Sequence, residues 1–110
     1  MDYQAPAEAA PLPPAVAEAL WRTAQEALAN VEKHSRAATA FVTLETGPRE
    51  AAVHVRDDGI GLPEEAELRP GHYGLRGLRE RVEGLGGAFT AARSQPNGTT
   101  IEARIPLLAA

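Results

Sequence analysis

The chain has 110 residues, a formal net charge of −4 and no cysteine, and its length predicts one domain with a single two-layer core. The absence of a basic excess argues against general nucleic-acid binding, and the lack of cysteine excludes disulfides and thiolate metal sites. No segment has the ~20 apolar residues of a membrane span or the pattern of a secretion signal. We therefore expect a cytoplasmic domain, whether or not a longer parent protein is anchored in a membrane.

The amino-terminal part of the chain differs in composition from the rest. Residues 1–13 contain many alanines and prolines without a sustained period, so we interpret them as a linker or an arm that leads into a domain at 14–110. From Ala15 to about His34, apolar residues recur at helical spacing, which predicts an amphipathic helix.

The remainder predicts two hairpins on either side of a second helix. The expected elements are strands at 38–46 and 51–57 joined by a turn at 47–49, a loop at 58–74, a helix from Leu75 to Leu85, and strands at 88–94 and 99–106 joined by a turn at 95–98. Period two places Asp57 and Thr99 on the inward, apolar face of their strands. The element order predicts an α+β fold, a two-layer α/β sandwich with helices on one face of a mixed sheet.

A polar stripe follows one edge of the first helix. Glu26 and Asn30 stand four residues apart and share a face, with Lys33 nearly in line. An amide oxygen is a suitable ligand for magnesium, and a neighbouring carboxylate can orient or deprotonate a group that attacks a γ-phosphate. The alternative is a solvated helix face with an ordinary polar pair.

Asp57 is expected at an apolar position, where a carboxylate must be paired because an unpaired buried charge is very costly. The exocyclic amine of adenine is a suitable donor, and Gly59 and Gly61 would let the backbone pass close to a base. The alternative is a turn in which Asp57-Asp58-Gly59 merely caps the strand.

Gly71, Gly74 and Gly77 surround the expected start of the second helix. A helix N-terminus presents free N–H groups and a favourable dipole to phosphates. The alternative is a flexible loop with a loose helix start. The spacing matches neither the dinucleotide fingerprint nor the P-loop, because no strand directly precedes it and Gly-Lys-Ser/Thr is absent.

In this order the motifs resemble those of the ATP-binding catalytic domain of sensor histidine kinases, within the GHKL (Bergerat-fold) group. The resemblance covers about Leu12 to Leu108. Leu20–Ser35, with Gln-Glu-Ala-Leu-Ala-Asn-Val-Glu-Lys-His, looks like the N box; Asp57–Gly61 looks like the first glycine box, Gly71–Arg81 like the second, and Asn97–Thr100 like the segment before the last strand. The N box and the second glycine box are most similar to those of the nitrate-sensor and DesK-like subfamily.

The resemblance implies a role for each matching position. Asn30 would coordinate Mg²⁺, and Glu26 would assist phosphoryl transfer as the catalytic residue. The remaining positions would bind ATP or ADP: Lys33 and His34 at the phosphates, Asp57 at the adenine amine with support from Thr99, and Gly59, Gly61, Gly71, Gly74, Leu75 and Gly77 around the pocket and its lid. The chain departs from the family at Asp58, where asparagine is usual, and in a short lid.

The resemblance also implies partners outside the chain. The phosphoacceptor histidine of such kinases lies on a separate dimerisation domain, and the phosphoryl group passes on to a response regulator. We therefore expect a monomeric catalytic domain with little autophosphorylation of its own. A stand-alone GHKL switch protein of the anti-sigma serine-kinase type is the alternative, followed by a degenerate nucleotide-binding module.

Overall fold

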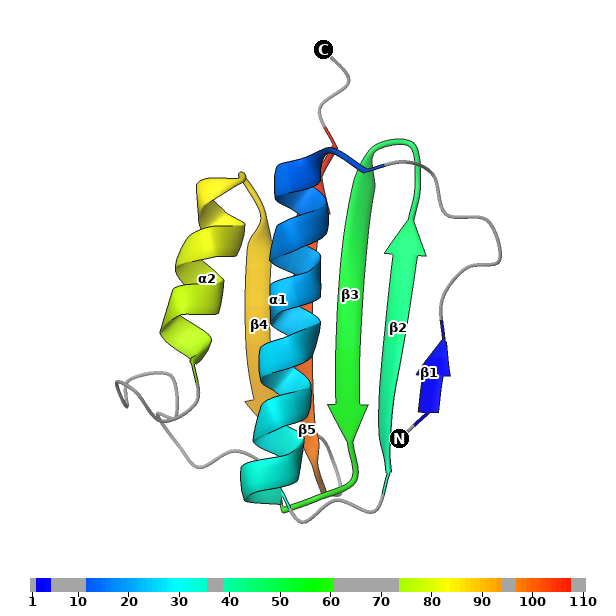
Figure 1. Cartoon of the computed structure of the whole chain (residues 1–110), viewed down its shortest axis with the longest axis vertical. Helices are drawn as coiled ribbons and strands as arrows, with labels where there is room; N and C mark the ends of the chain where they lie inside the picture. Colours follow the sequence, from blue (N-terminus) through cyan, green and yellow to red (C-terminus); the bar gives the residue numbers. More distant parts are fainter. Residues whose placement is uncertain (1, 5–11, 36–38, 61–73, 94–96, 108–110) are drawn as a thin grey trace.

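The computed structural model in Figure 1 describes residues 2–4, 12–35, 39–60, 74–93 and 97–107, with backbone alone for 2–4, 34 and 35. In chain order the elements are β1 (Asp2–Gln4), α1 (Pro14–Asn30), η1 (Val31–Ser35), β2 (Ala40–Thr46), β3 (Glu50–Asp57), α2 (Leu75–Gly84), β4 (Ala88–Arg93) and β5 (Thr99–Pro106). The sheet order is β1-β2-β3-β5-β4, with β1 parallel to β2 and the other pairs antiparallel.

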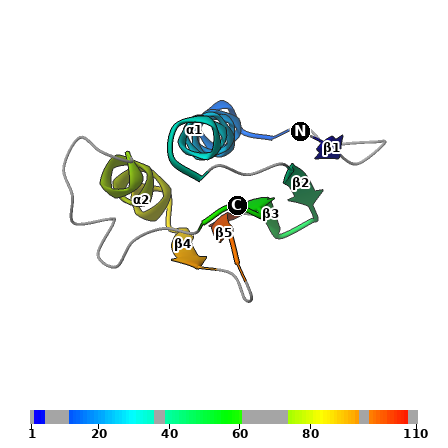
Figure 2. The same ribbon diagram turned by 90° about the horizontal axis from the view of Figure 1, so that it is seen from below.

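Both helices cover the same face of this sheet, as the end-on view in Figure 2 shows. The α+β two-layer sandwich with a mixed sheet is therefore confirmed. None of the helices in the described segments is long and apolar enough to cross a bilayer.

The core lies between the two layers and follows from the alternation in the strands. In β5 the residues that face the helices are buried and their neighbours are half-buried, as period two requires. Apolar side chains from both helices close the layer from the other side. The core includes Val16, Ala19, Leu20 and Ala27 of α1, Leu75, Leu78 and Val82 of α2, and Val53, Val55, Phe89, Ile101 and Ile105 of the sheet.

The second helix ends at Gly84, within one residue of the predicted end at Leu85, and Gly86 and Gly87 follow it. The N–H of Gly86 donates to the carbonyl of Glu83 at 2.9 Å, and that of Gly87 donates to the carbonyl of Val82 at 3.0 Å. These two bonds form a Schellman motif, in which Gly86 takes a positive φ of 79°. The chain then turns directly into β4.

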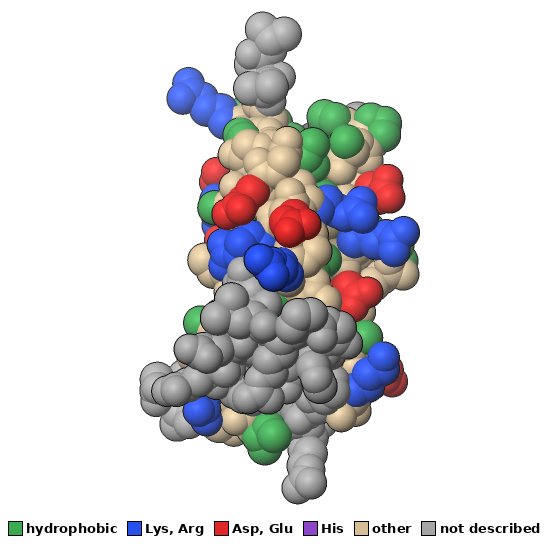
Figure 3. Space-filling view, turned by 90° about the vertical axis from the view of Figure 1, so that its left-hand side faces the viewer, with side chains coloured by type: hydrophobic (Ala, Val, Ile, Leu, Met, Phe, Trp, Pro, Cys, Tyr) green, Lys and Arg blue, Asp and Glu red, His purple; other side chains and the backbone are tan. Residues whose placement is uncertain are grey.

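Charged side chains on α2 are paired with one another or with α1. Arg76 lies 4.0 Å from Glu80, and Arg81 lies 3.6 Å from Glu18. On the face that carries α2, basic and acidic side chains are accordingly interspersed (Figure 3). This face presents no patch of a single sign among the described residues.

Two elements differ from those that the sequence predicts. Three residues of the amino-terminal segment form β1, which is too short to show an alternating pattern of its own. The first helix changes to a π-helical turn after Asn30, and the N–H of Val31 is shared between the carbonyls of Ala27 and Leu28. The 3.6-residue period therefore ends at Asn30, so that the position of Lys33 follows π-helical geometry.

Four element ends meet at the lower end of the molecule in Figure 1. They are the C-terminus of α1, the C-terminus of β3, the N-terminus of α2 and the N-terminus of β5. Most of the predicted site residues that the structure describes lie at or near these ends, although they come from distant parts of the chain.

Candidate functional site

A buried carboxylate closes the inner face of the sheet at this end. Asp57, the last residue of β3, is opposite Thr99 in the β3–β5 register, and each is only 6% exposed. Its Oδ1 accepts a hydrogen bond from the N–H of Gly59 at 2.8 Å, which makes an Asx turn. A carboxylate has about four acceptor positions, so that one internal bond leaves capacity for a ligand's donor.

The next residue, Asp58, is held from both sides. Its Oδ1 accepts a bond from the N–H of Thr39 at 3.0 Å, and its own N–H donates to the Thr39 carbonyl at 3.3 Å. From the other side, the Asn97 amide donates to the Asp58 carbonyl at 2.8 Å. The aspartate at the position where the family favours asparagine thus ties the end of β3 to the start of β2.

The backbone at Gly98 touches the same turn. A Cβ there would overlap the carbonyl oxygen of Asp57, and the residue has a positive φ of 96°. Both conditions require glycine. The start of β5 therefore lies in direct contact with the acidic turn.

Glu26 of α1 lies beside the start of α2. A Cβ added to Gly74 would be 2.9 Å from Oε2 of Glu26, so the carboxylate rests against the backbone at the N-cap of α2. Gly74 has a φ of 70°, and its carbonyl accepts the first helical bond from Leu78 at 3.2 Å. The structure thus brings together the N box and the second glycine box.

The other predicted residues take different positions. Asn30 is buried at 9% exposure as the last residue of α1, whereas Lys33 is exposed in η1. Leu75 packs in the core as the first residue of α2, whereas Gly77 is exposed, and a Cβ at Gly77 would meet no described atom within 4 Å. Gly61, Gly71 and the side chain of His34 lie outside the described residues.

Among the described residues, no group of three His, Cys, Asp or Glu side chains is placed to hold a metal ion. The donors present suit a cation that takes most of its ligands from phosphates and water. The amide oxygen of Asn30 is a hard donor of the kind that Mg²⁺ prefers.

Sequence reasoning missed the residues that hold the turn. Asn97 was recognisable only as part of the segment before the last strand, and Thr39 carried no signal. Their contacts with Asp58 depend on the β2–β3 and β3–β5 registers, which spacing along the chain does not reveal. The contact of Glu26 with Gly74 likewise depends on how the two helices pack.

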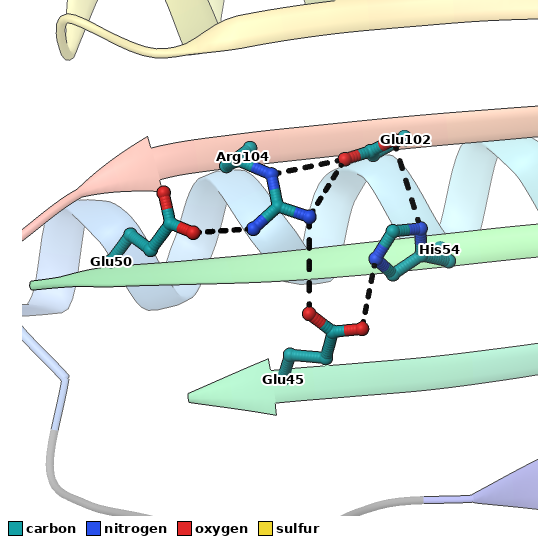
Figure 4. A network of polar contacts seen from close by, with 5 residues as sticks. All are labelled: Glu45, Glu50, His54, Glu102 and Arg104. Atoms are coloured by element: carbon teal, nitrogen blue, oxygen red, sulfur yellow. Dashed lines mark hydrogen bonds and ion pairs between the residues drawn. The ribbon is translucent and has the colours of Figure 1, made fainter. Parts of the chain in front are cut away.

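A second polar cluster occupies the outer face of the sheet (Figure 4). Arg104 of β5 contacts Glu50 at 2.5 Å, Glu102 at 3.0 Å and Glu45 at 3.8 Å. Hydrogen bonds from Arg104 to Glu50, and to a lesser extent to Glu102, raise the pKa of the guanidinium above its ordinary value. Nε2 of His54 lies 3.3 Å from Oε1 of Glu45, and Nδ1 lies 3.8 Å from Oε2 of Glu102; Nε2 is buried and makes no hydrogen bond among the described residues.

The fold and this arrangement of residues match a known family. Residues 15–109 match the family described as "Histidine kinase-, DNA gyrase B-, and HSP90-like ATPase". The chain belongs to this family.

Its similar relatives include sensor kinases. The nitrate/nitrite sensor protein NarX of Escherichia coli is 36% identical over 92% of this chain, and this chain spans only 16% of that protein. NarQ of the same organism is 41% identical over 70% of the chain and is matched over 14% of its own length. DegS of Brevibacillus brevis, a signal transduction histidine-protein kinase/phosphatase, is 40% identical over 81% of the chain and 23% of its own length.

Solved structures agree on the fold. The histidine kinase domain of the blue-light activated kinase EL346 from Erythrobacter litoralis has a TM-score of 0.73 and 30% identity, covering 96% of this chain and 50% of that one. The ATP-binding domain of PrrB from Mycobacterium tuberculosis has a TM-score of 0.67 at 20% identity, covering 99% of this chain and 82% of that one. This second likeness concerns the fold alone.

Proposed function

We propose that this chain binds Mg²⁺-ATP and donates its γ-phosphoryl group to a histidine on a separate dimerisation domain, for relay to a response regulator. The observation that carries the proposal is the buried carboxylate of Asp57 beside Thr99, at the end where the N box and the second glycine box meet. Family membership and the sensor-kinase relatives support it.

Adenine recognition would depend on Asp57. Its Oδ1 is engaged by Gly59, and the carboxylate retains acceptor capacity for the exocyclic amine of the base. A carboxylate that is this buried is stabilised by a donor from the ligand, because an unpaired charge in an apolar setting is costly. Thr99, opposite it, would border the same base.

Phosphate handling would fall to the C-terminus of α1 and the N-terminus of α2. Asn30 would supply an amide oxygen to Mg²⁺, which neutralises phosphate charge when bound. Lys33 in η1 would add positive charge and His34 would contact the phosphates, while the first N–H groups of α2 after Gly74 would donate to phosphate oxygens. The remaining glycines, Gly61, Gly71 and Gly77, would shape the lid.

Glu26 would act on the transferring group. Its carboxylate already lies against the N-cap of α2, where the phosphates would be bound, so it can orient or accept the proton of the attacking imidazole. Because the acceptor histidine would belong to another domain, the chain would label itself little; we further propose that it is a monomer in the cytoplasm.

Calorimetry with ATP and ADP, with and without Mg²⁺, tests this proposal. We expect binding of both nucleotides in the micromolar to millimolar range, tighter with Mg²⁺. Asn30→Ala should remove the magnesium-dependent part of the affinity and leave binding of metal-free adenosine nearly unchanged. Absence of nucleotide binding at millimolar ATP by the folded chain would refute the proposal.

Glu26→Gln separates binding from transfer. It should preserve nucleotide affinity and lower phosphoryl transfer to the dimerisation domain of a reconstituted kinase by roughly 10²- to 10⁴-fold, the range of general-base catalysis. Unchanged transfer would remove Glu26 from the catalytic role.

A further inference from the structure

We propose that Asn97 and Arg93, which flank the β4–β5 connection, are positioning residues that hold the Asx turn of Asp57 and so set the selectivity for the base. This inference rests on the proposed function, because it concerns the same adenine site. Neither residue has to touch the nucleotide for this role.

The side chain of Asn97 adds one more link between the β3 and β5 segments, just past the last backbone pair of these strands. The register ends at Asp57 opposite Thr99, and the next link is the bond from the Asn97 amide to the Asp58 carbonyl at 2.8 Å. Gly98 brings the backbone of this segment against Asp57 itself. The peptide that follows Asp57 is therefore fixed from the β5 side, in addition to the two bonds of Asp58 to Thr39 on the β2 side.

Arg93 holds the other end of the turn. Its Nη2 donates to the carbonyl of Ile60 at 3.4 Å, a longer and weaker bond than that of Asn97. Asn97 and Arg93 thus donate to the carbonyls of the residues before and after Gly59. The N–H of Gly59 in turn donates to Oδ1 of Asp57. Rotation of the Gly59 N–H would turn the carboxylate with it.

The direction of that carboxylate decides which base it accepts. Adenine presents an amine at C6, which can donate to Asp57, whereas hypoxanthine presents a carbonyl, which would oppose the carboxylate as acceptor against acceptor. A fixed turn keeps this mismatch in place. A loosened turn lets the carboxylate move away, so it weakens adenine binding and relieves the clash with hypoxanthine.

The test compares ADP with inosine diphosphate, which differ at C6, by calorimetry on the full 110-residue chain. We expect Asn97→Ala to weaken ADP binding by roughly three- to tenfold, the effect of one net hydrogen bond, while inosine diphosphate binding changes less. Asn97→Asp should do more, because it sets a carboxylate against the Asp58 carbonyl. Arg93→Gln should act in the same direction with a smaller change.

The selectivity ratio separates positioning from general destabilisation. A variant that merely unfolds part of the population lowers both affinities by the same factor, and its melting temperature falls accordingly. Thr90→Ala, an exposed outer-face residue of β4, serves as the matched control and should change neither affinity.

The outcomes are distinct. Unchanged ADP affinity in folded Asn97→Ala, or equal losses for the two nucleotides, would overturn the positioning role while leaving the proposed function intact. Failure of the unsubstituted chain to bind ADP would overturn the proposed function and this inference with it.

Discussion

The sheet carries charged side chains on both faces, and the two faces differ in how those side chains are paired. On the outer face, Arg104 and His54 meet the carboxylates of Glu45, Glu50 and Glu102 within the chain. On the inner face, Asp57 is buried opposite the neutral Thr99 and makes its internal bond to a backbone N–H. The outer carboxylates have partners within the chain, whereas the buried carboxylate retains acceptor capacity that, under the proposed function, serves the nucleotide.

The energies of the two faces differ for the same reason. Exposed ion pairs contribute about 0–1 kcal/mol each, because water and salt screen them. Burial of a carboxylate opposes folding unless donors offset the lost hydration. Under the proposed function, a bound nucleotide would therefore stabilise the inner face in a way that it would not stabilise the outer face.

Among the substitutions that test this difference between the faces, Asp57→Asn should cause the largest loss of nucleotide affinity. With the amide oxygen bonded to Gly59, the amide NH₂ would face the adenine amine, donor against donor. We expect affinity for ATP and ADP to fall together by about 1–3 kcal/mol, roughly 5- to 150-fold, as measured by calorimetry.

Glu102→Gln on the outer face of β5 is the matched control, since it also exchanges a carboxylate for an amide. It should leave both affinities unchanged. Equal affinities for Asp57→Asn and the unsubstituted chain, with the fold intact by circular dichroism, would remove Asp57 from adenine recognition.

Substitutions at Gly74 and Gly77, at the start of α2, should give the next largest effect, a change in the free energy of unfolding. Gly74→Ala forces a side chain into a positive φ of 70° and sets its Cβ 2.9 Å from the Glu26 carboxylate, so we expect a loss of about 1–2 kcal/mol in the free energy of unfolding. Gly77→Ala lies in the first turn of α2, where the new Cβ meets no described atom within 4 Å, and the higher helix propensity of alanine should raise the free energy of unfolding by about 0.5–1 kcal/mol. Urea unfolding of both variants measures the contrast, and a similar change in each would contradict it.

Arg104→Gln tests the outer face and should have the smallest effect. We expect a lower melting temperature at low salt, a difference that shrinks as salt screens the cluster, and unchanged nucleotide affinity. Because hydrogen bonds to Glu50 and Glu102 raise the pKa of Arg104 above its ordinary value, the stability that it contributes is complete below the pKa of the unfolded chain and is lost only as the pH rises through the raised value. The guanidinium itself therefore adds no pH dependence near neutrality. A change in ADP affinity would show that the two faces are coupled.

The features that could be predicted from the sequence are those that follow from the spacing of apolar residues along the chain. Alternation placed Asp57 and Thr99 on the inner face, and the structure pairs them in register. Helical spacing located α1 and α2 to within a few residues, and the turn signals located both hairpins. The roles of the site residues stay predictions.

The sequence could not predict what depends on contact between distant segments. The approach of Glu26 to Gly74 arises from the packing of two helices, and the bond from Asn97 to Asp58 arises from the register of two strands that are far apart in the chain. The three residues of β1 are too few to establish a period. The π-turn depends on a local rearrangement of backbone hydrogen bonds that no residue type signals on its own.

The sheet order also dictates when the site forms during folding. Each hairpin, β2–β3 and β4–β5, closes through a short connection, whereas β3 and β5 pair across the whole segment from 58 to 98. Closing that longer loop costs more chain entropy, so we expect the hairpins to form before they dock. Asp57 and Thr99 come together only at docking. A ligand that needs both residues selects the fully assembled chain and slows its opening, which makes hydrogen exchange at the β3–β5 seam a direct report of occupancy.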